Sequence, residues 1–288
     1  MEFVFEIVKT VLLGIVEGIT EWLPISSTGH MILLNDLLRL RVSDAFWEMF
    51  EVVIQLGAIL AVVVLYFGKL WPLAKKQSLG GNCLFSVGRL GVKKDTMLLW
   101  AKVLVAMLPA AVVGILLDDW MNAHFYNSVV VAVALILYGV LFILVERKNR
   151  DKVYAVNTVD EINFKTALGI GLFQTLSLVP GTSRSGSTIL GASMLSVSRG
   201  AAAEFSFFLA IPVMLGASAL KVLKFFLDGG SFGGTEVILL AVGCAVAFIV
   251  SIAAIRFLTD FVKKHSFSAF GVYRIVLGVI VLLAYLVR

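Results

Sequence analysis

Long apolar runs dominate the chain, and six of them have the length of a membrane span. A helix needs about 20 apolar residues to cross the hydrocarbon core of a bilayer. Charges inside these runs are few, and we expect Lys221, Lys224 and Arg274, which lie toward span ends, to snorkel to the membrane surface. The pattern predicts six transmembrane helices, at residues 49–67, 97–117, 127–145, 205–227, 237–255 and 270–287.

A seventh apolar stretch, 10–38, is interrupted in the middle. Glu17 and Glu21 lie in its first half, and Pro24 then precedes the polar run Ser-Ser-Thr-Gly-His at 26–30. Each arm on its own is too short to cross the bilayer. The stretch therefore predicts a helix–loop–helix hairpin that enters the membrane and returns.

An eighth stretch, 166–195, has the same design. Pro180 breaks it, and the run Gly-Thr-Ser-Arg-Ser-Gly-Ser-Thr follows at 181–188. Irregular backbone at membrane depth is tolerated only where it is buried in protein or lines a wet cavity. Both hairpins are thus predicted to be re-entrant and to lie inside the helix bundle.

The two interrupted stretches align with each other without a gap. GIVEGITEWLPISSTGH, from Gly14, matches GLFQTLSLVPGTSRSGS, from Gly171, and pairs Glu17 with Gln174. A hairpin followed by three spans occurs twice, which is the mark of an internal repeat. We expect an all-α polytopic membrane protein, a single membrane domain over 1–288 built from two repeats, 1–150 and 151–288.

The number of spans and the loop charges bear on orientation. Three spans in each repeat is an odd number, so the second repeat is expected to be inverted relative to the first. Basic residues favour the cytoplasmic side. The loops that this topology places inside carry 14 basic residues against 2 in the outer loops; the inner loops are 68–96, 146–165, 196–204 and 259–269. Both termini are expected outside, with the hairpins entering from opposite faces.

Composition excludes most other classes of protein. Of 288 residues, 60% are apolar or aromatic and 15% are charged, whereas soluble domains have about 25% charged residues. A soluble enzyme, a disordered chain and a disulfide scaffold are excluded. The net charge of +5 reports orientation rather than a nucleic-acid partner, so membrane lipids are the expected surroundings. Cys83 and Cys244 lie in different environments and are expected to be free thiols.

Glu17 and Glu21 are candidate metal ligands. One helical turn separates them, so their carboxylates face the same way. Two anions in apolar surroundings require protonation, water or a cation between them. A divalent cation, Mg²⁺ or Ca²⁺, would relieve the repulsion and bridge to a phosphate. The alternative is a solvated pair at the membrane surface.

The first hairpin loop also carries hydroxyls and an imidazole. Ser26, Ser27, Thr28, Gly29 and His30 follow the proline. A hydroxyl and a histidine three residues apart are suited to act as nucleophile and base. The alternative is a hydroxyl-rich tip that only caps a helix.

The second hairpin loop predicts an anion site. Thr182, Ser183, Arg184, Ser185 and Gly186 lead into a helix, whose first backbone N–H groups bind anions. Arginine binds a phosphate through two parallel hydrogen bonds. The alternative, compatible with the first before substrate arrives, is an arginine paired with Glu17 or Glu21.

The two hairpins together favour phosphoryl hydrolysis. They offer carboxylates for a metal, an arginine for phosphate, and a hydroxyl with a histidine. Four residues that begin spans are candidates to line the same cavity: Glu48, Glu51, Gln55 and Glu204. The alternative function is a secondary transporter, because inverted repeats with broken helices are typical of transporters.

At these residues the chain resembles the undecaprenyl-diphosphate phosphatase family of the bacitracin-resistance type. The resemblance rests on E-x-x-x-E followed by P-x-S-S-T-G-H and on P-G-T-S-R-S-G-S-T, and it extends over FEVVIQLGA, AAEFSFFLAIP and FGVYRIVLG, at 17–30, 180–188, 50–58, 202–212 and 270–278. It implies hydrolysis of undecaprenyl diphosphate to undecaprenyl phosphate and phosphate, a divalent cation, and residence in the bacterial cytoplasmic (inner) membrane with the active site facing the periplasm.

The resemblance also implies roles for individual residues. Glu17 and Glu21 would hold metal or diphosphate, Ser27 would be the nucleophile, and His30 would be the base or an alternative nucleophile. Arg184 would bind the diphosphate, with further contacts from the loop residues Ser26, Thr28, Gly29, Thr182, Ser183, Ser185 and Gly186. The choice of nucleophile among Ser27, His30 and water stays open, as does the oligomeric state, a homodimer included. With the lipid that the resemblance implies, the transporter alternative becomes a flippase for a polyprenyl phosphate.

Overall fold

In the computed structural model, six of the described helices are long and apolar enough to cross a membrane, as predicted. They cover Asp44–Leu65, Lys94–Leu117, Ser128–Lys148, Arg199–Leu227, Gly234–Lys264 and Ser268–Leu286. The structure describes residues 2–286, with the side chains of all of these except 32, 35–37, 118, 119 and 122; the last residue of the predicted span 270–287 lies outside it. The chain is an all-α polytopic membrane protein.

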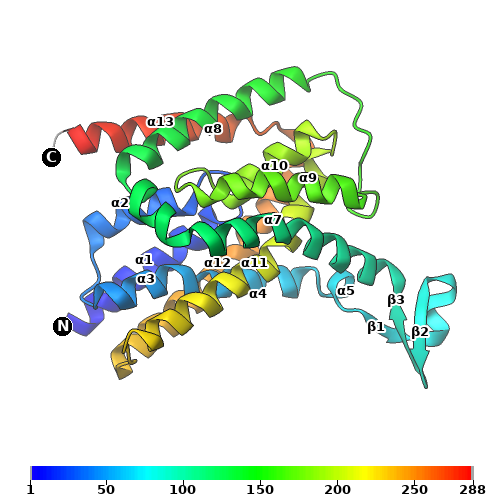
Figure 1. Cartoon of the computed structure of the whole chain (residues 1–288), viewed down its shortest axis with the longest axis horizontal. Helices are drawn as coiled ribbons and strands as arrows, with labels where there is room; N and C mark the ends of the chain where they lie inside the picture. The colour runs from blue at the N-terminus through cyan, green and yellow to red at the C-terminus, as the bar shows by residue number, and fades with distance from the viewer. Residues whose placement is uncertain (1, 287–288) are drawn as a thin grey trace.

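Along the chain, each of the two hairpins is followed by three spans (Figure 1). The first hairpin consists of α1 (Glu2–Thr20) and α2 (Ser27–Leu38), and the second of α9 (Phe164–Gln174), η2 (Thr175–Leu178) and α10 (Arg184–Met194). The long helices are α3 (Asp44–Val53) with α4 (Gln55–Leu65), α7 (Lys94–Phe125), α8 (Ser128–Lys148), α11 (Arg199–Leu227), α12 (Gly234–Lys264) and α13 (Ser268–Leu286).

The first hairpin begins and ends at one end of the molecule. The Lys9 ammonium group, in α1, donates to the carbonyl oxygen of Arg39, just beyond α2, at 3.0 Å. The backbone N–H of Arg41 donates to the Glu6 carboxylate at 3.0 Å. These contacts close the two arms of the hairpin at their base, because α2 returns to the level at which α1 began.

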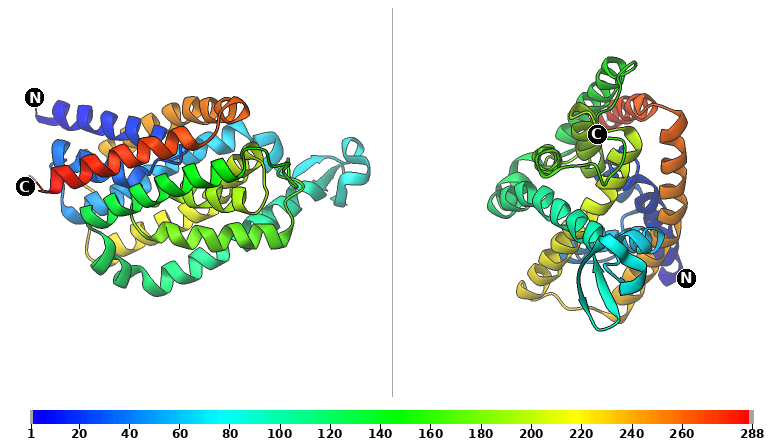
Figure 2. Two further views of the ribbon diagram at one scale, coloured as in Figure 1. Left: turned by 90° about the horizontal axis from the view of Figure 1, so that it is seen from above. Right: turned by 90° about the vertical axis from the view of Figure 1, so that its right-hand side faces the viewer.

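The second hairpin closes in the same way, at the opposite end. The backbone N–H of Ala155 donates to the carbonyl of Ser196 at 3.1 Å, and that of Ser198 donates to Val156 at 2.8 Å. The first residues of α1 and the last residues of α13 lie at the same end of the molecule as the base of the first hairpin, away from the base of the second (Figures 1 and 2). The tips of the two hairpins therefore approach each other from opposite ends of the bundle.

Glycines allow the first arm of each hairpin to lie against a long helix. A methyl group added at Gly14 of α1 would come within 2.9 Å of the carbonyl oxygen of Gly243 in α12. One added at Gly171 of α9 would come within 2.2 Å of the carbonyl oxygen of Ala106 in α7. Small residues at such contacts are how membrane helices achieve close packing. The glycines thus set the depth at which each hairpin tip lies.

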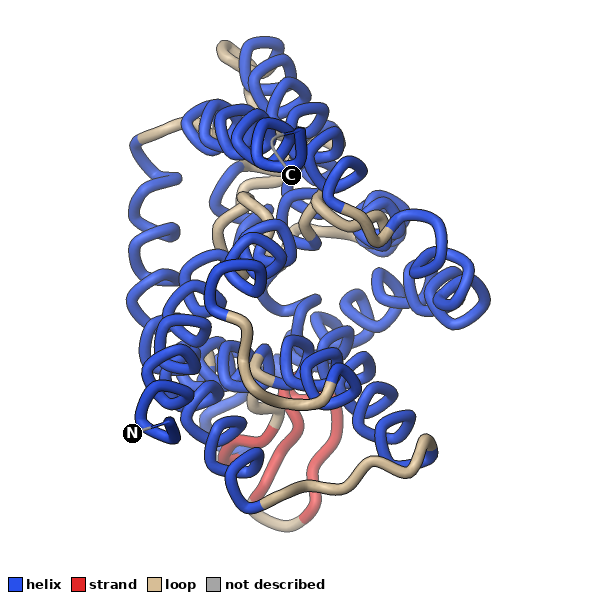
Figure 3. Tube along the Cα trace, turned by 90° about the vertical axis from the view of Figure 1, so that its left-hand side faces the viewer, coloured by secondary structure: helices blue, strands red, loops and turns tan. Residues whose placement is uncertain are grey.

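A small antiparallel sheet follows α4, in a segment for which the sequence predicted only a basic loop. Its strands pair in the order β1-β3-β2 and stand behind the helices when the molecule is viewed from the end with the termini (Figure 3). Gly88, with φ 61°, forms the turn between two of them. The elements of this segment are α5 (Phe67–Leu70), β1 (Leu73–Lys75), α6 (Lys76–Leu79), η1 (Gly80–Asn82), β2 (Cys83–Val87) and β3 (Leu90–Lys93).

Both cysteines are free, as expected: Cys83 is in β2 and Cys244 is in α12.

Arg274 corrects one expectation. Its side chain does not snorkel to the membrane surface but is fully buried, with 0% exposure. The guanidinium donates to the carbonyl oxygens of Pro24, Gly181 and Thr182, at 3.1, 2.8 and 2.9 Å. Broken helices leave carbonyl groups without helical partners, and buried carbonyls need donors. Arg274 supplies them to both hairpin tips at once and so holds the tips together.

Candidate active site

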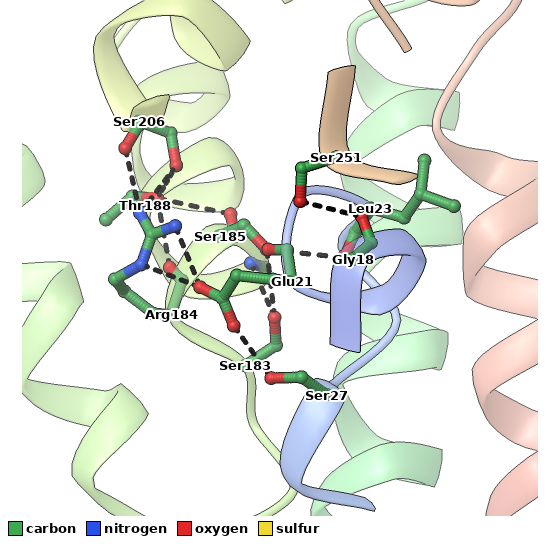
Figure 4. Close-up of polar contacts among 11 residues, drawn as sticks. Gly18, Glu21, Leu23, Ser27, Ser183, Arg184, Ser185, Thr188, Ser206 and Ser251 are labelled. Carbon is green, nitrogen blue, oxygen red and sulfur yellow. Dashed lines mark hydrogen bonds and ion pairs between the residues drawn. The ribbon is translucent and has the colours of Figure 1, made fainter. Parts of the chain in front are cut away.

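The two hairpin tips meet at the carboxylate of Glu21 (Figure 4). The Ser27 hydroxyl donates to Glu21 Oε2 at 2.8 Å. Arg184, from the other hairpin, donates to Oε1 through Nη2 at 3.0 Å and Nε at 3.3 Å. All three side chains are buried or nearly so. One carboxylate thus joins the predicted nucleophile to the predicted anion-binding arginine.

Ser27 and Arg184 each follow a serine that begins a helix. Ser26 and Ser183 both have left-handed backbone, with φ 75° and 71°. Each side chain accepts a hydrogen bond from the backbone N–H three residues on, that of Gly29 at 3.3 Å and that of Gly186 at 3.1 Å. Such caps begin helices. Ser27 and Arg184 are in consequence the first residues of α2 and α10, whose positive ends converge on the site.

Further contacts fix the arginine from behind. Arg184 Nη1 donates to the carbonyl of Ser206 at 2.8 Å and lies 3.3 Å from its hydroxyl. That hydroxyl is 2.7 Å from the Thr188 hydroxyl. The guanidinium carbon is 5.9 Å from the centre of the Trp22 ring. The sequence reasoning assigned no role to Ser206 or Thr188, although Thr188 ends the motif that contains Arg184.

The remaining loop residues hold the backbone. The Ser185 hydroxyl donates to the carbonyls of Glu21 and Leu23, at 3.1 and 3.3 Å, and so joins the tips a second time. The Thr182 hydroxyl donates to the carbonyl of Val179 at 2.7 Å. Thr28, in the first turn of α2, is partly exposed. These residues shape the site through its backbone.

His30 lies apart from the serine with which its spacing predicts a pair. Its Nδ1 is 2.7 Å from the carbonyl oxygen of Ser26, and its Nε2 is 2.7 Å from the Tyr273 hydroxyl of α13. The Ser27 hydroxyl turns instead to Glu21. The physical reason is that α2 directs the serine toward the second hairpin and the imidazole toward α13. In this arrangement the Glu21 carboxylate, rather than the imidazole, accepts the hydrogen bond of the Ser27 hydroxyl.

Glu17 is fully buried, and within the described residues neither carboxylate oxygen has a hydrogen-bond partner. Its charged neighbours include Glu21, Glu51 and Arg184. A buried charge without a partner is costly, so this carboxylate fits a cation. Among the side chains that the structure describes, no group of three or more His, Cys, Asp or Glu is placed to hold a metal ion. Glu17 and Glu21 are two carboxylates, a number compatible with Mg²⁺, which commonly binds one or two carboxylates together with phosphate oxygens and water.

Of the span residues proposed to line the cavity, Glu48 pairs with Lys221 at 3.5 Å, and Gln55 stays a prediction. Glu51 faces this region. It lies in electrostatic reach of Glu17 and accepts a hydrogen bond from the Tyr126 hydroxyl at 2.8 Å. Glu204 pairs with Lys69 at 3.0 Å. Lys69 also lies 3.8 Å from Asp160 in the loop before α9, at the base of the second hairpin. Glu204 therefore does not belong to the site.

The fold and the site define the class of protein: a multi-pass membrane protein with a buried carboxylate, hydroxyl and arginine between two broken helices, a donor set suited to phosphoryl groups. The profile of one family, described as bacitracin resistance protein BacA, matches residues 10–280. The chain belongs to this family.

Relatives that match nearly the whole chain are named for an enzymatic activity. A protein named undecaprenyl-diphosphatase from Enterococcus faecalis is 56% identical over 281 residues, which cover 96% of each chain. One of that name from Acetivibrio thermocellus is 56% identical, with 98% of each chain covered. Another, from Desulfitobacterium hafniense, is 55% identical, covering 98% of this chain and 97% of its own.

Proposed function

We propose that this protein hydrolyses undecaprenyl diphosphate to undecaprenyl phosphate and inorganic phosphate. It thereby recycles the lipid carrier for cell-wall polymer synthesis and gives resistance to bacitracin. Support comes from relatives above 50% identity over nearly the whole chain. The observation that carries the chemistry is the Glu21 carboxylate, which binds the Ser27 hydroxyl and Arg184 at the same time.

The first step follows from this geometry. Ser27 Oγ attacks the terminal phosphorus, and its proton passes to Glu21 Oε2, 2.8 Å away. The bond from that phosphorus to the bridging oxygen breaks, and undecaprenyl phosphate leaves with the bonding pair. Arg184 moves its hydrogen bonds from the neutralised carboxyl group to the phosphoryl oxygens, where negative charge must be stabilised.

The second step restores the enzyme. Water attacks the phosphorus of the phosphoserine, and the bond to Ser27 Oγ breaks. The serine oxygen takes back the proton held by Glu21, and inorganic phosphate leaves with both protons of the water. The converging starts of α2 and α10 favour the anions throughout, since helix N-termini carry partial positive charge. The Glu21 carboxylate thus acts as the general base of the first step and, once protonated, as the general acid of the second.

Glu17, together with Glu21, would hold the divalent cation, Mg²⁺ or Ca²⁺. The support is the buried Glu17 carboxylate with its two unpartnered oxygens. When bound, the cation would offset the negative charge of the diphosphate. Two carboxylates supply only part of a coordination shell, so cation and diphosphate are expected to bind more tightly together than either does alone.

We place the protein in the cytoplasmic membrane as two inverted repeats, with the site opening to the outer face. The loop-charge bias supports this orientation. Matching helix pairs support the repeats, because α1 packs on α12 as α9 packs on α7, and α8 packs on α13. Cys83, in the sheet, is a natural reporter. Inverted vesicles expose the cytoplasmic side, so an impermeant thiol reagent should label Cys83 in them. Labelling only in right-side-out vesicles would show that the orientation is the opposite of the one proposed.

Turnover by purified protein in detergent tests the enzymatic function against the transporter alternative, because no transport can occur without a membrane. We expect cation-dependent release of one phosphate per undecaprenyl diphosphate and none from undecaprenyl phosphate. Absence of phosphate release, with binding of the lipid retained, would contradict hydrolysis and favour a flippase.

A further inference from the structure

His30 is held through both of its ring nitrogens. Nδ1 is 2.7 Å from the carbonyl oxygen of Ser26, four residues earlier, and Nε2 is 2.7 Å from the hydroxyl of Tyr273. The two rings are stacked, with centres 5.7 Å apart and planes 9° from parallel. Distance and ring orientation together make this a defined contact between α2 and α13 rather than a chance approach.

These contacts fix the tautomer of the imidazole. A carbonyl oxygen only accepts hydrogen bonds, so Nδ1 must carry the proton that bonds to Ser26. In the neutral ring, Nε2 then holds the lone pair, and the Tyr273 hydroxyl is the donor. A hydroxyl can both donate and accept. Tyr273 therefore donates to Nε2 of the neutral ring and can accept a hydrogen bond from Nε2 when the ring is protonated.

Tyr273 stands next to the residue that joins the hairpin tips. Arg274, its neighbour on α13, binds the tip carbonyls of both hairpins. Tyr273 itself lies at the edge of the bundle, 44% exposed, and reaches only the first hairpin through His30. Two consecutive residues of one helix thus contact the tips and the imidazole: Arg274 binds the tip carbonyls, and Tyr273 binds His30, which in turn bonds the carbonyl of Ser26.

We propose that Tyr273 is a positioning residue for His30: its hydroxyl donates to Nε2 and holds the ring with the proton on Nδ1, where the ring bonds the carbonyl of Ser26 directly before Ser27. The effect on turnover rests on the proposed function, whereas the tautomer does not. Arg274 is the charged group that faces the ring from α13.

Nitrogen-15 NMR of histidine-labelled protein in micelles tests the tautomer directly. The chain has only three histidines. Nδ1 of His124 and Nδ1 of His265 also face backbone carbonyls four residues earlier. Within the described residues, only His30 has a hydrogen bond at Nε2, so the other two serve as internal references, and His30→Gln assigns the signal.

We expect the wild type at neutral pH to show His30 protonated at Nδ1, with Nε2 as a hydrogen-bonded acceptor. Tyr273→Phe should remove that hydrogen bond from the Nε2 signal and lower kcat about fivefold, the value of one hydrogen bond, with little change in KM. Tyr285→Phe, on the exposed face of the same helix, should change neither quantity.

A wild-type spectrum with the proton on Nε2 would overturn the proposal without any variant. It would also fall if Tyr273→Phe lowered kcat while the His30 signals stayed in place, because the tyrosine would then act by another route. The predicted spectra in a protein that releases no phosphate would refute the hydrolase function and leave the positioning contact intact.

Discussion

The two hairpin tips have the same backbone and different side chains. Each has a left-handed serine, Ser26 or Ser183, that caps a glycine three residues later and begins a helix. The residues that follow them, Ser27 and Arg184, are equivalent in the alignment of the two stretches. Both bind Glu21, which in the second hairpin is replaced by a leucine. One structural unit, used twice, thus carries the proposed nucleophile once and the proposed anion-binding group once.

This difference shows where function resides in the fold. The cap, the helix start and the close glycine contacts are common to both hairpins and set geometry. The ionisable side chains differ and set chemistry: the first hairpin carries the carboxylates, and the second carries the guanidinium. Opposite charges in the two halves also hold the tips together in a medium where an unpaired charge is costly.

The largest effect should come from Ser27→Ala. The variant removes the attacking oxygen, so kcat should fall by on the order of 10³-fold or more. The measurement is phosphate release in detergent. Ser218→Ala, which removes a buried hydroxyl bonded to the carbonyl of Val52, should keep wild-type turnover. Near-wild-type activity of Ser27→Ala would transfer the attack to water or His30.

Arg184→Lys tests the second hairpin. A lysine retains the charge but loses the fork that binds a carboxylate or phosphate through two nitrogens. We expect kcat/KM to fall about 10²-fold, because a misplaced phosphoryl group reacts poorly. The matched control is Arg199→Lys, which alters a similar pair with Glu146 outside the site. Equal losses in both variants would point to general destabilisation.

Glu17→Gln gives the first hairpin the residue that the second has at Gln174. If Glu17 holds the cation, the cation concentration that gives half-maximal activity should rise about tenfold or more in this variant. Much of kcat should return when the cation is saturating. Cation titration of phosphate release measures this. Glu204→Gln should leave the titration unchanged. An unaltered titration of Glu17→Gln would remove this residue from the cation site.

The smallest effects concern packing and should appear in stability rather than chemistry. A methyl group at Gly171 meets backbone at 2.2 Å, and one at Gly14 meets it at 2.9 Å. Gly171→Ala should therefore lower the melting temperature by about 3–8 °C, and Gly14→Ala should lower it less. Gly216→Ala, with open space around it, is the reference. The reverse order would mean that the second hairpin is not packed as described.

The spans, the two broken stretches and most of the site could be predicted from sequence. Membrane spans follow from length and apolarity, which are local properties. The proline and the polar run mark each break, and Glu21, Ser27 and Arg184 stand out because a charge or hydroxyl at membrane depth is costly without a function. Their alignment also indicated that they would be near one another.

Contacts between distant residues could not be predicted. Arg274 resembles a snorkelling residue in sequence, and only the fold shows that it binds Pro24 and Gly181. His30 meets Tyr273 across 243 positions, a distance over which spacing carries no information. The sheet around Gly88 was missed for another reason: its strands are short, and the apolar spans on either side conceal their pattern.

The sharing of one carboxylate between the two hairpins is the central claim, and Glu21→Gln tests it most directly. The amide cannot take the Ser27 proton and carries no charge for Arg184. Phosphate release from undecaprenyl diphosphate by the purified variant should be about 10²- to 10⁴-fold below wild type at every cation concentration. Turnover close to wild type, or full recovery when the cation is raised, would contradict the account.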